Sequence, residues 1–327
     1  MDAHVAFIAG RVAVLVALCV VAGCAGRLAP FPADARDGAE LNAVPFFPQQ
    51  SHQCGPAALA TVLAFEGEPV VPDDLVPEVY LPAREGSLQP EIVGAVRRRG
   101  RVPWQLTGGL DELVAEIDAG RPVLVLQNLG VSWFPSWHYA VVVGYDSSRD
   151  HLVLRSGTQA RRVERREIFL RTWNRSKAWG LVVLEPGELP ARPDATRYFA
   201  ALAALESVGQ SGTAAAGYAA MVARWPERPE GHFGTGNLAL AERRLADAEA
   251  AYRRALDASS GRHVAARNNL AVTLLERGCA RAAAEEATRA LGAITVEDPL
   301  RPAVEDTLRQ AQSRERAVPD VEGCPLP

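Results

Sequence analysis

Three kinds of hydrophobic pattern follow one another along the 327 residues of the chain. An unbroken apolar run covers 12–23, helical and strand patterns are mixed over 41–187, and alanine-rich helical periodicity continues from 195 onward. A chain of this length is long for one ordinary domain and about right for two. We therefore expect two domains, at 41–187 and 195–298, with a linker at 24–40 and a capping helix and tail at 299–327.

The middle segment combines helical periodicity with buried strands. Good helix formers cover 57–65, and the strands that follow are joined by a short turn at 147–150. We expect strands at 122–127, 139–146, 152–155 and 181–184, and further helices at 88–99, 110–119 and 166–174. Because a helix comes first and the strands return on one another, we expect an α+β domain with a mainly antiparallel sheet.

The apolar run at the N-terminus is typical of a targeting signal, because it follows Arg11 and is too short to span a bilayer comfortably. It ends in VAGC at 21–24, which resembles the lipobox of bacterial lipoproteins. The resemblance implies a signal peptide over 1–23 and a lipid on Cys24; an ordinary secretory signal or an uncleaved anchor is the alternative. Ala25, where an aspartate would favour the inner membrane, favours the outer membrane. We expect a protein that faces the periplasm and meets the membrane only through its lipid.

Composition excludes several classes of function. The formal net charge is -4, so no basic excess indicates a nucleic-acid partner. Hydrophobic residues make up 48% of the chain, as in a globular protein with a core. The five cysteines contain no CxxC pair, which argues against a disulfide scaffold and a structural zinc site. We expect no metal and no cofactor.

The cysteines of the exported chain divide by position. Once the signal is removed and Cys24 is lipidated, Cys54, Cys279 and Cys324 remain. Cys279 and Cys324 both lie in the C-terminal part, so we expect them to form a disulfide. Cys54 is then a free thiol in an oxidising compartment, where a purely structural role gives little reason to keep one.

Cys54 stands at the start of a predicted helix. The sequence QCGP at 53–56 precedes the helical run, and Pro56 suits the first helical turn. The exposed N–H groups and the dipole of a helix N-terminus favour a thiolate, which is the placement that a nucleophilic cysteine needs. The alternative is a cysteine that only packs in the core.

A nucleophilic cysteine needs a base, and His138 is the best candidate. It lies at the start of an apolar strand, where it can face the helix that begins near Cys54. A structural histidine is the alternative. We expect His52 in a loop and His151 at the surface. The aromatic residues at 133–137 crowd the approach to His138, either as the wall of a substrate groove or as a packed loop.

The stretches QCGPAALATVL at 53–63 and HYAVVVGYD at 138–146 together resemble the C39-like peptidases, papain-fold cysteine peptidases related to the bacteriocin-processing domains of export transporters. The resemblance covers roughly 40–186. It implies that Cys54 is the nucleophile and His138 the general base. It also implies an oxyanion-hole glutamine shortly before the cysteine, for which Gln49 is our choice and Gln50 the alternative. The backbone N–H of Cys54 would be the second donor.

The chain departs from this family at the third catalytic position. The family usually carries Asp-Pro after the returning strand, and that aspartate orients the histidine. Here the matching residues are RSG at 155–157. Ser156 would replace the aspartate, with Gln159 as another candidate. A serine can bond to the imidazole, but it cannot stabilise an imidazolium by charge.

The C-terminal segment contains an internal repeat with a period near 34 residues. Ala214–Val222, Ala248–Leu256 and Ala283–Leu291 correspond to one another, and Tyr218 matches Tyr252. The pattern resembles about three tetratricopeptide repeats over 196–292, with a capping helix near 303–316; a generic helical bundle is the alternative. The resemblance implies small residues where helices approach, and a surface that recruits a protein partner.

The sequence is compatible with three functions. The first is a lipid-anchored thiol peptidase that acts on peptides or proteins. The second is an adaptor that keeps the fold and binds peptides or protein partners without cleaving them. The third is acyl or amide transfer by the same cysteine and histidine.

Overall fold

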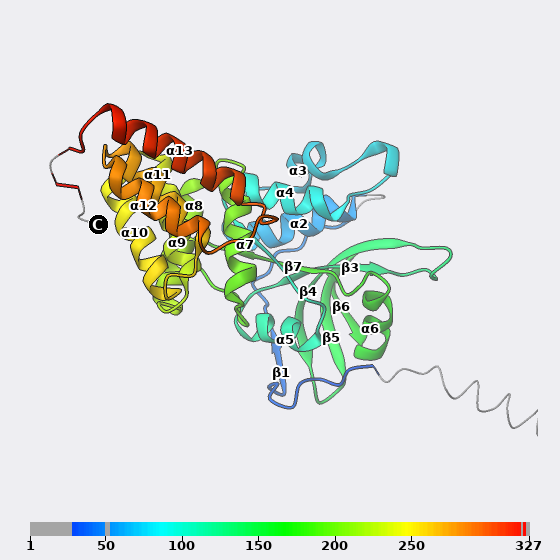
Figure 1. Cartoon of the computed structure of the whole chain (residues 1–327). Helices are drawn as coiled ribbons and strands as arrows, with labels where there is room; N and C mark the ends of the chain where they lie inside the picture. The colour runs from blue at the N-terminus through cyan, green and yellow to red at the C-terminus, as the bar shows by residue number, and fades with distance from the viewer. Residues whose placement is uncertain (1–27, 50–52, 322, 325–327) are drawn as a thin grey trace, which may run out of the picture.

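The computed structural model describes residues 28–49, 53–321, 323 and 324 (Figure 1). The signal peptide, Cys24, Gln50 and His52 lie outside the described residues. Within the part that is described, no helix combines the length and the apolar character needed to cross a membrane.

The first part of the chain is α+β, as the sequence predicts. The described residues form a sheet whose strands run in the order β2-β7-β3-β4-β5-β6, with β1 paired to β4, and all of these pairs are antiparallel. The strands are β1 (Gly38–Glu40), β2 (Val102–Gln105), β3 (Val123–Asn128), β4 (Trp137–Asp146), β5 (His151–Ser156), β6 (Gln159–Arg165) and β7 (Gly180–Leu184).

Helices cover both faces of this sheet (Figure 1). They are α2 (Cys54–Phe65), α3 (Pro72–Val79), α4 (Gln89–Arg98), α5 (Leu110–Asp118) and α6 (Arg166–Asn174), with a short 3-10 turn at Pro82–Arg84. One buried cluster joins α2, α3 and α4 to Leu124, Val141 and Val183 of the sheet. A second cluster joins α5 and α6 to the other face. Helix α2 is buried along most of its length, which suits its run of alanine, leucine and valine.

Strands β1, β2 and β6 were not expected from the sequence, and β1 and β6 change the layout at the edges. The expected linker at 24–40 ends in β1, whose residues pair with Gly144–Asp146 of β4, and Leu28 and Phe31 pack against the core. Strand β6 has little apolar alternation, because it is an exposed edge strand with the sequence QARRVER. The linker is therefore shorter than expected, and the sheet is one strand wider at this edge.

The second part of the chain is all helical. Its helices are α7 (Ala195–Glu206), α8 (Ser211–Arg224), α9 (Pro229–Ala241), α10 (Leu245–Ala258), α11 (Val264–Glu276), α12 (Ala280–Leu291) and α13 (Arg301–Ala317). They pack as the hairpins α7/α8, α9/α10 and α11/α12, and α13 lies against α12 (Figure 1).

Small residues allow these helices to approach closely. A Cβ atom on Gly234 would lie 2.3 Å from the Tyr218 ring, and one on Gly236 would lie 2.6 Å from the Tyr252 ring. Since real Cβ atoms do not come so near a ring, each buried tyrosine occupies the space that a glycine of α9 leaves. Tyr218 and Tyr252 come from equivalent positions of the repeat, so the packing follows its period.

The two parts share a core at the junction, which we define as Trp104, Glu116, Arg121, Arg197 and Tyr198. Trp104 and Tyr198 are both buried, with ring centroids 6.3 Å apart, and the Arg197 guanidinium lies 4.2 Å from the Trp104 ring. Arg121 bonds Glu116 at 2.7 Å. The first helical hairpin is therefore fixed to the sheet rather than tethered by a loop.

The C-terminal tail folds back onto the repeat region. Cys279 and Cys324 form a disulfide with their Cα atoms 5.4 Å apart, and Cys324 packs against the buried cluster of α10–α13. The backbone N–H of Val321 donates to the carbonyl of Gly278 at 3.4 Å. The bridge thus closes the tail over the start of α12.

Candidate active site

Helix α2 begins at Cys54, so the thiol lies at the helix N-terminus. The backbone N–H of Ala57 donates to the carbonyl of Gln53 at 3.1 Å, which closes the first turn. A Cβ atom on Gly55 would lie 2.2 Å from Ser87 Oγ, so the glycine lets the chain near Ser87 pack directly on this turn.

The thiol of Cys54 is half-buried and free of a disulfide. Burial raises its pKa, and the backbone N–H groups of Tyr139, Gly55 and Cys54 itself only partly oppose this effect. The backbone N–H groups at the helix N-terminus thus act on the pKa in the expected direction, but desolvation is the larger effect. Loss of solvent outweighs the helix terminus, and the thiol form is favoured.

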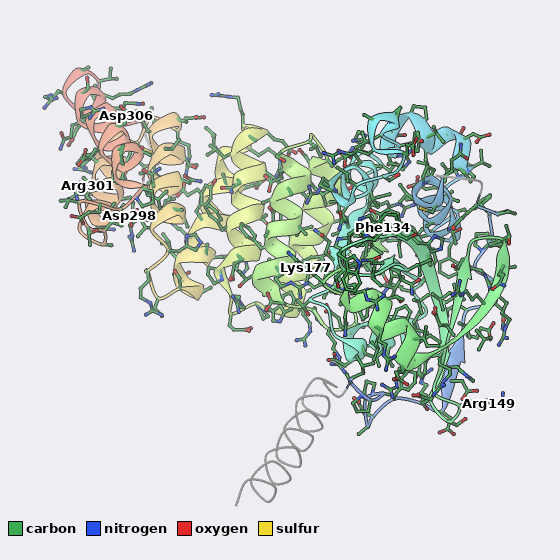
Figure 2. All side chains as sticks on the ribbon, turned by 90° about the vertical axis from the view of Figure 1, so that its right-hand side faces the viewer. Phe134, Arg149, Lys177, Asp298, Arg301 and Asp306 are labelled. Atoms are coloured by element: carbon green, nitrogen blue, oxygen red, sulfur yellow. A yellow bond between two sulfur atoms is a disulfide. The ribbon has the colours of Figure 1, made fainter. Side chains whose placement is uncertain are left out.

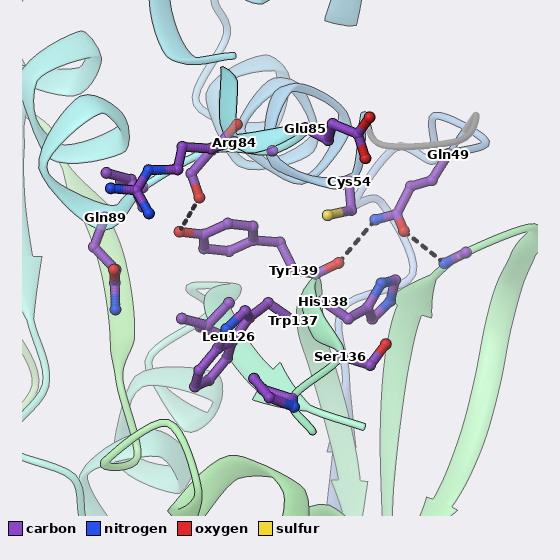
Figure 3. Close-up of a pocket in the computed structure, with 15 residues that line it drawn as sticks. Gln49, Cys54, Arg84, Glu85, Gln89, Leu126, Ser136, Trp137, His138 and Tyr139 are labelled. Atoms are coloured by element: carbon purple, nitrogen blue, oxygen red, sulfur yellow. Dashed lines mark hydrogen bonds between the residues drawn. The ribbon is translucent and has the colours of Figure 1, made fainter. Parts of the chain in front are cut away.

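His138 is the second residue of β4, opposite Gln127 of β3. Its Nε2 atom and Ser156 Oγ form a hydrogen bond of 2.9 Å. Because one ring nitrogen is engaged, Nδ1 is the nitrogen that remains for a proton transfer. Cys54, His138 and Gln49 line the same cleft (Figure 3).

Burial also governs the charge of His138. It lowers the pKa of the imidazole to about 4, and the positive charge of Arg162 acts in the same direction. At neutral pH the site therefore holds a thiol and a neutral imidazole. In the tautomer whose Nε2–H donates to Ser156 Oγ, Nδ1 is an acceptor, so the neutral imidazole can take the proton of the thiol as a general base.

Ser156 occupies the position of the third catalytic residue. It is the last residue of β5, is buried, and bonds to the His138 ring. Gln159, its partner in the register of β5 and β6, is exposed. Among the described residues, the hydrogen-bond partner of the ring is a hydroxyl and no carboxylate bonds to it. The ring is therefore oriented without a compensating negative charge.

Gln49 is held on both sides. Its Nε2 donates to the carbonyl of Tyr139 at 3.0 Å, and its Oε1 accepts from the backbone N–H of Gly157 at 2.9 Å (Figure 3). The backbone N–H of Gln49 also donates to the carbonyl of Gly157 at 3.0 Å. An amide nitrogen carries two N–H groups, so one remains that can donate to an oxyanion. This side chain links β4 to the turn between β5 and β6.

The cleft holds about 920 Å³ and has two walls. One wall comes from β3, β4 and the loop between them, and the other comes from the segment 84–89. His151 is outside the cleft, because it pairs with Asp146 at the other end of β4.

Sequence reasoning missed the second wall. The segment 84–89 follows the short turn at Pro82–Arg84 and is closed by a bridge between Leu81 and Gly86. The Tyr139 hydroxyl donates to the carbonyl of Ser87 at 3.3 Å and so ties this segment to β4. The segment has no hydrophobic period, so no local signal marks it; only the small Gly55 beside Cys54 points to a close neighbour.

Comparisons with known proteins agree with this geometry. Residues 41–180 match the model of the Peptidase_C39 like family. No curated protein is significantly similar to the chain.

Solved structures are similar to each part separately. A C39-like peptidase from Bacillus anthracis is 18% identical with a TM-score of 0.40, over 46% of this chain and 98% of that one. The peptidase domain of Streptococcus ComA, a bi-functional ABC transporter, is 19% identical with a TM-score of 0.36, over 43% of this chain and 98% of that one. The type III secretion translocator chaperone SycD of Yersinia enterocolitica is 14% identical with a TM-score of 0.34, over 37% and 85%.

The match of the family model covers the whole cleft, from Gln49 through Cys54 and His138 to Gly157. The hairpins α7–α13 follow it in the chain, with the glycine–tyrosine packing of the repeat. Residues 41–180 therefore match the C39-like peptidase family, and the all-helical region behind them has the paired helices and the glycine–tyrosine packing of the sequence repeat.

Proposed function

We propose that the protein is a cysteine peptidase whose reaction starts from a neutral thiol and a neutral imidazole. One observation carries the proposal: Cys54, His138 and Gln49 line one cleft, and His138 is fixed through Nε2 so that Nδ1 stays free. A base whose pKa is about 4 is unprotonated at neutral pH and so is ready to accept a proton.

The chemical steps follow from these roles. Cys54 Sγ attacks the carbonyl carbon of the peptide bond while His138 Nδ1 takes the thiol proton. The oxyanion accepts hydrogen bonds from Gln49 Nε2 and from the Cys54 backbone N–H. Nδ1 then gives its proton to the leaving amine, and a thioester on Cys54 remains. Water attacks this thioester with His138 as the base, which releases the acid and the free thiol.

The rate of this reaction depends on Ser156, because its hydroxyl is the hydrogen-bond partner of the His138 ring. It orients the ring, but it does not stabilise the imidazolium that forms when Nδ1 takes the proton. Removing the carboxylate of a related triad costs about 10⁴-fold in rate. We therefore expect slow turnover compared with a site that carries an aspartate at this position.

The same observation supports a second candidate, an adaptor that binds peptides without cleaving them. A buried histidine with a lowered pKa and no carboxylate partner is also what an inactive descendant of a peptidase would contain. The two candidates differ in whether Cys54 forms a covalent intermediate.

Cleavage of a complex peptide mixture separates the two. We would incubate the purified protein with peptides from a proteome digest and identify new termini by mass spectrometry, beside the Cys54→Ala and His138→Ala variants. The peptidase predicts termini that vanish in Cys54→Ala and fall at least 100-fold in His138→Ala, with unchanged circular dichroism. Termini that persist in Cys54→Ala would refute it, and peptide binding without cleavage would establish the adaptor.

The anchor and the repeats belong to the same proposal. A lipid on Cys24 would hold the protein at the outer membrane on its periplasmic side, and the helical hairpins would bring a protein substrate or partner to it. Intact mass measurement of the membrane-bound protein beside Cys24→Ser tests the lipid. An unmodified cysteine in the wild type would remove this part of the proposal.

A further inference from the structure

The cleft continues past the reacting groups on one side only. In Figure 3, Gln49 lies on one side of Cys54, while Leu126 and Trp137 lie on the other, below the ring of Tyr139; Arg84 and Glu85 lie above. Trp137 and Tyr139 are two residues apart in β4, so their side chains lie on the same face of the sheet. Leu126 of β3 is paired with Tyr139 and lies on that face as well. That face forms an apolar floor beside the thiol.

The floor is held in place from both directions. Leu126 and Tyr139 are buried, and the Tyr139 ring packs edge-on against Trp179 with centroids 5.9 Å apart. From above, the segment near Ser87 is fixed by the Tyr139 hydroxyl, and Leu88 of that segment is 40% exposed. A ligand that enters here meets preformed walls rather than mobile chain.

The remaining wall is a loop built without charge. The aromatic loop, residues 129–137, has the sequence LGVSWFPSW and contains no charged residue. Asn128 Oδ1 accepts from the backbone N–H groups of Gly130 at 3.0 Å and Ser136 at 2.9 Å, and Arg175 donates to the carbonyl of Gly130 at 2.5 Å. Figure 2 shows Phe134 in this loop at one end of β4 and Arg149 in the turn at the other end.

Within this ordered loop, Trp137 and Trp133 differ in one respect that matters. Trp137 lines the cleft and is 54% exposed, whereas Trp133 lies at the tip of the loop, is 86% exposed and does not line the cleft. The half-exposed Trp137 indole lines the cleft, next to the buried side chains of Leu126 and Tyr139. A ligand in the cleft would cover exposed apolar surface of this indole.

We propose that this side of the cleft is a subsite for a bulky, uncharged side chain, with Trp137 as its wall. The inference rests on the proposed function, since it takes Cys54 as the reacting group. It assigns the substrate class as polypeptides that carry an aromatic or large aliphatic residue beside the bond that Cys54 attacks. Ionised side chains are disfavoured on this floor, because they would lose water against Leu126 and Tyr139; the charged lining residues Arg84 and Glu85 belong to the opposite wall.

Alkylation of Cys54 tests the subsite without requiring turnover. We would measure the second-order rate constants for iodoacetamide, N-benzyl iodoacetamide and an N-carboxyethyl iodoacetamide by intact mass, with glutathione as the reference thiol. The rate constant for the benzyl probe divided by that for iodoacetamide, called the benzyl ratio, corrects for the reactivity of the thiol itself. We expect this ratio to be at least tenfold above that of glutathione in the wild type, and the carboxyethyl probe to show no such gain.

The matched variants are Trp137→Ala and Trp133→Ala, which make the same change inside and outside the cleft. Trp137→Ala should return the benzyl ratio to within threefold of glutathione, and Trp133→Ala should keep the wild-type ratio. A wild-type ratio equal to that of glutathione, or an equal fall in both variants, would overturn the subsite. A high ratio in a protein that cleaves no peptide would retain the subsite while the proposed peptidase function fails. Peptide cleavage by a protein whose benzyl ratio is near that of glutathione would support the peptidase function and refute the subsite.

Discussion

The junction and the cleft both bury ionisable side chains, but the two regions differ in how they compensate the loss of solvent around those side chains. At the junction, Glu116 is fully buried and bonds Arg121 at 2.7 Å, while Arg121 also bonds Glu188 at 2.7 Å. In the cleft, His138 has only the hydroxyl of Ser156. One region compensates a buried charge with an opposite charge, and the other keeps its buried imidazole uncharged.

This difference separates a structural region from a reactive one. Burial raises the pKa of Glu116, and the charge of Arg121 opposes that rise. No such opposing charge acts on His138, so its pKa falls to about 4. The ion pair, together with the bond from the Ala191 backbone N–H to Glu116, fixes the segment that leads into α7 against α5. The uncompensated imidazole, in contrast, stays unprotonated and can accept a proton.

The largest expected effect is on the apolar part of the junction. Trp104→Ala removes a buried indole that contacts Tyr198 and Arg197, and it should lower the free energy of unfolding by about 3–5 kcal/mol. Urea denaturation followed by circular dichroism measures this loss. The matched control is Trp133→Ala, at an 86% exposed position, which should change stability by less than about 0.5 kcal/mol. Equal losses in both variants would show that the junction contributes no core.

The ion pair of the junction should respond to pH once it is broken. Arg121→Met leaves Glu116 buried without its cation, which should cost about 3 kcal/mol at pH 8. As the pH falls toward 5, the buried carboxyl takes up a proton that the unfolded chain does not hold, so the loss should shrink. Arg149→Met, at an exposed arginine, serves as the control in the same denaturation series. A loss that grows toward pH 5 would contradict the role of Glu116.

A carboxylate beside His138 would give the cleft the kind of opposite charge that Arg121 gives to Glu116 at the junction. Ser156→Asp places a carboxylate next to His138 Nε2, which should raise the pKa of the imidazole from about 4 and stabilise the imidazolium. We expect kcat/KM near pH 7 to rise about tenfold and its acid limb to move to higher pH. The pH–rate profile on a cleaved peptide provides both readouts.

The control for this substitution uses the neighbouring strand. Gln159→Asp adds the same charge opposite Ser156 in the register, on an exposed side chain. It should leave the acid limb where it is. An unchanged profile in Ser156→Asp, with the fold intact, would mean that the imidazolium is not formed on the reaction path.

Local patterns made much of this fold predictable. Strands β3, β4, β5 and β7 are apolar runs, and the first helical turn at Cys54 follows from Gly55 and Pro56. Strand β2 was missed because it is short and contains Pro103, and α3 because Pro77 lies inside it. Such elements are specified by the neighbours that they pack against.

The site was predictable in its members but not in its electrostatics. Cys54 and His138 were identified from their local sequence, and Gln49 and Ser156 from the resemblance to C39-like peptidases. The structure places them around one cleft and its supporting hydrogen bonds. A helix N-terminus is visible in sequence, whereas the depth at which it is buried is not. The burial that raises the pKa of Cys54 was therefore not predictable from the sequence.

The smallest effect, and the most direct test of the contrast, is the pH dependence of Cys54 alkylation. Because burial raises the pKa of this thiol from its ordinary value of 9.0, the iodoacetamide rate should climb through pH 9 without a plateau at lower pH. His138→Ala should leave this profile within about twofold above pH 6, since the imidazole is already neutral there. A plateau below pH 7 that disappears in His138→Ala would reveal a preformed thiolate–imidazolium pair. The cleft would then balance buried charge with charge, as the junction does, and the neutral mechanism would be wrong.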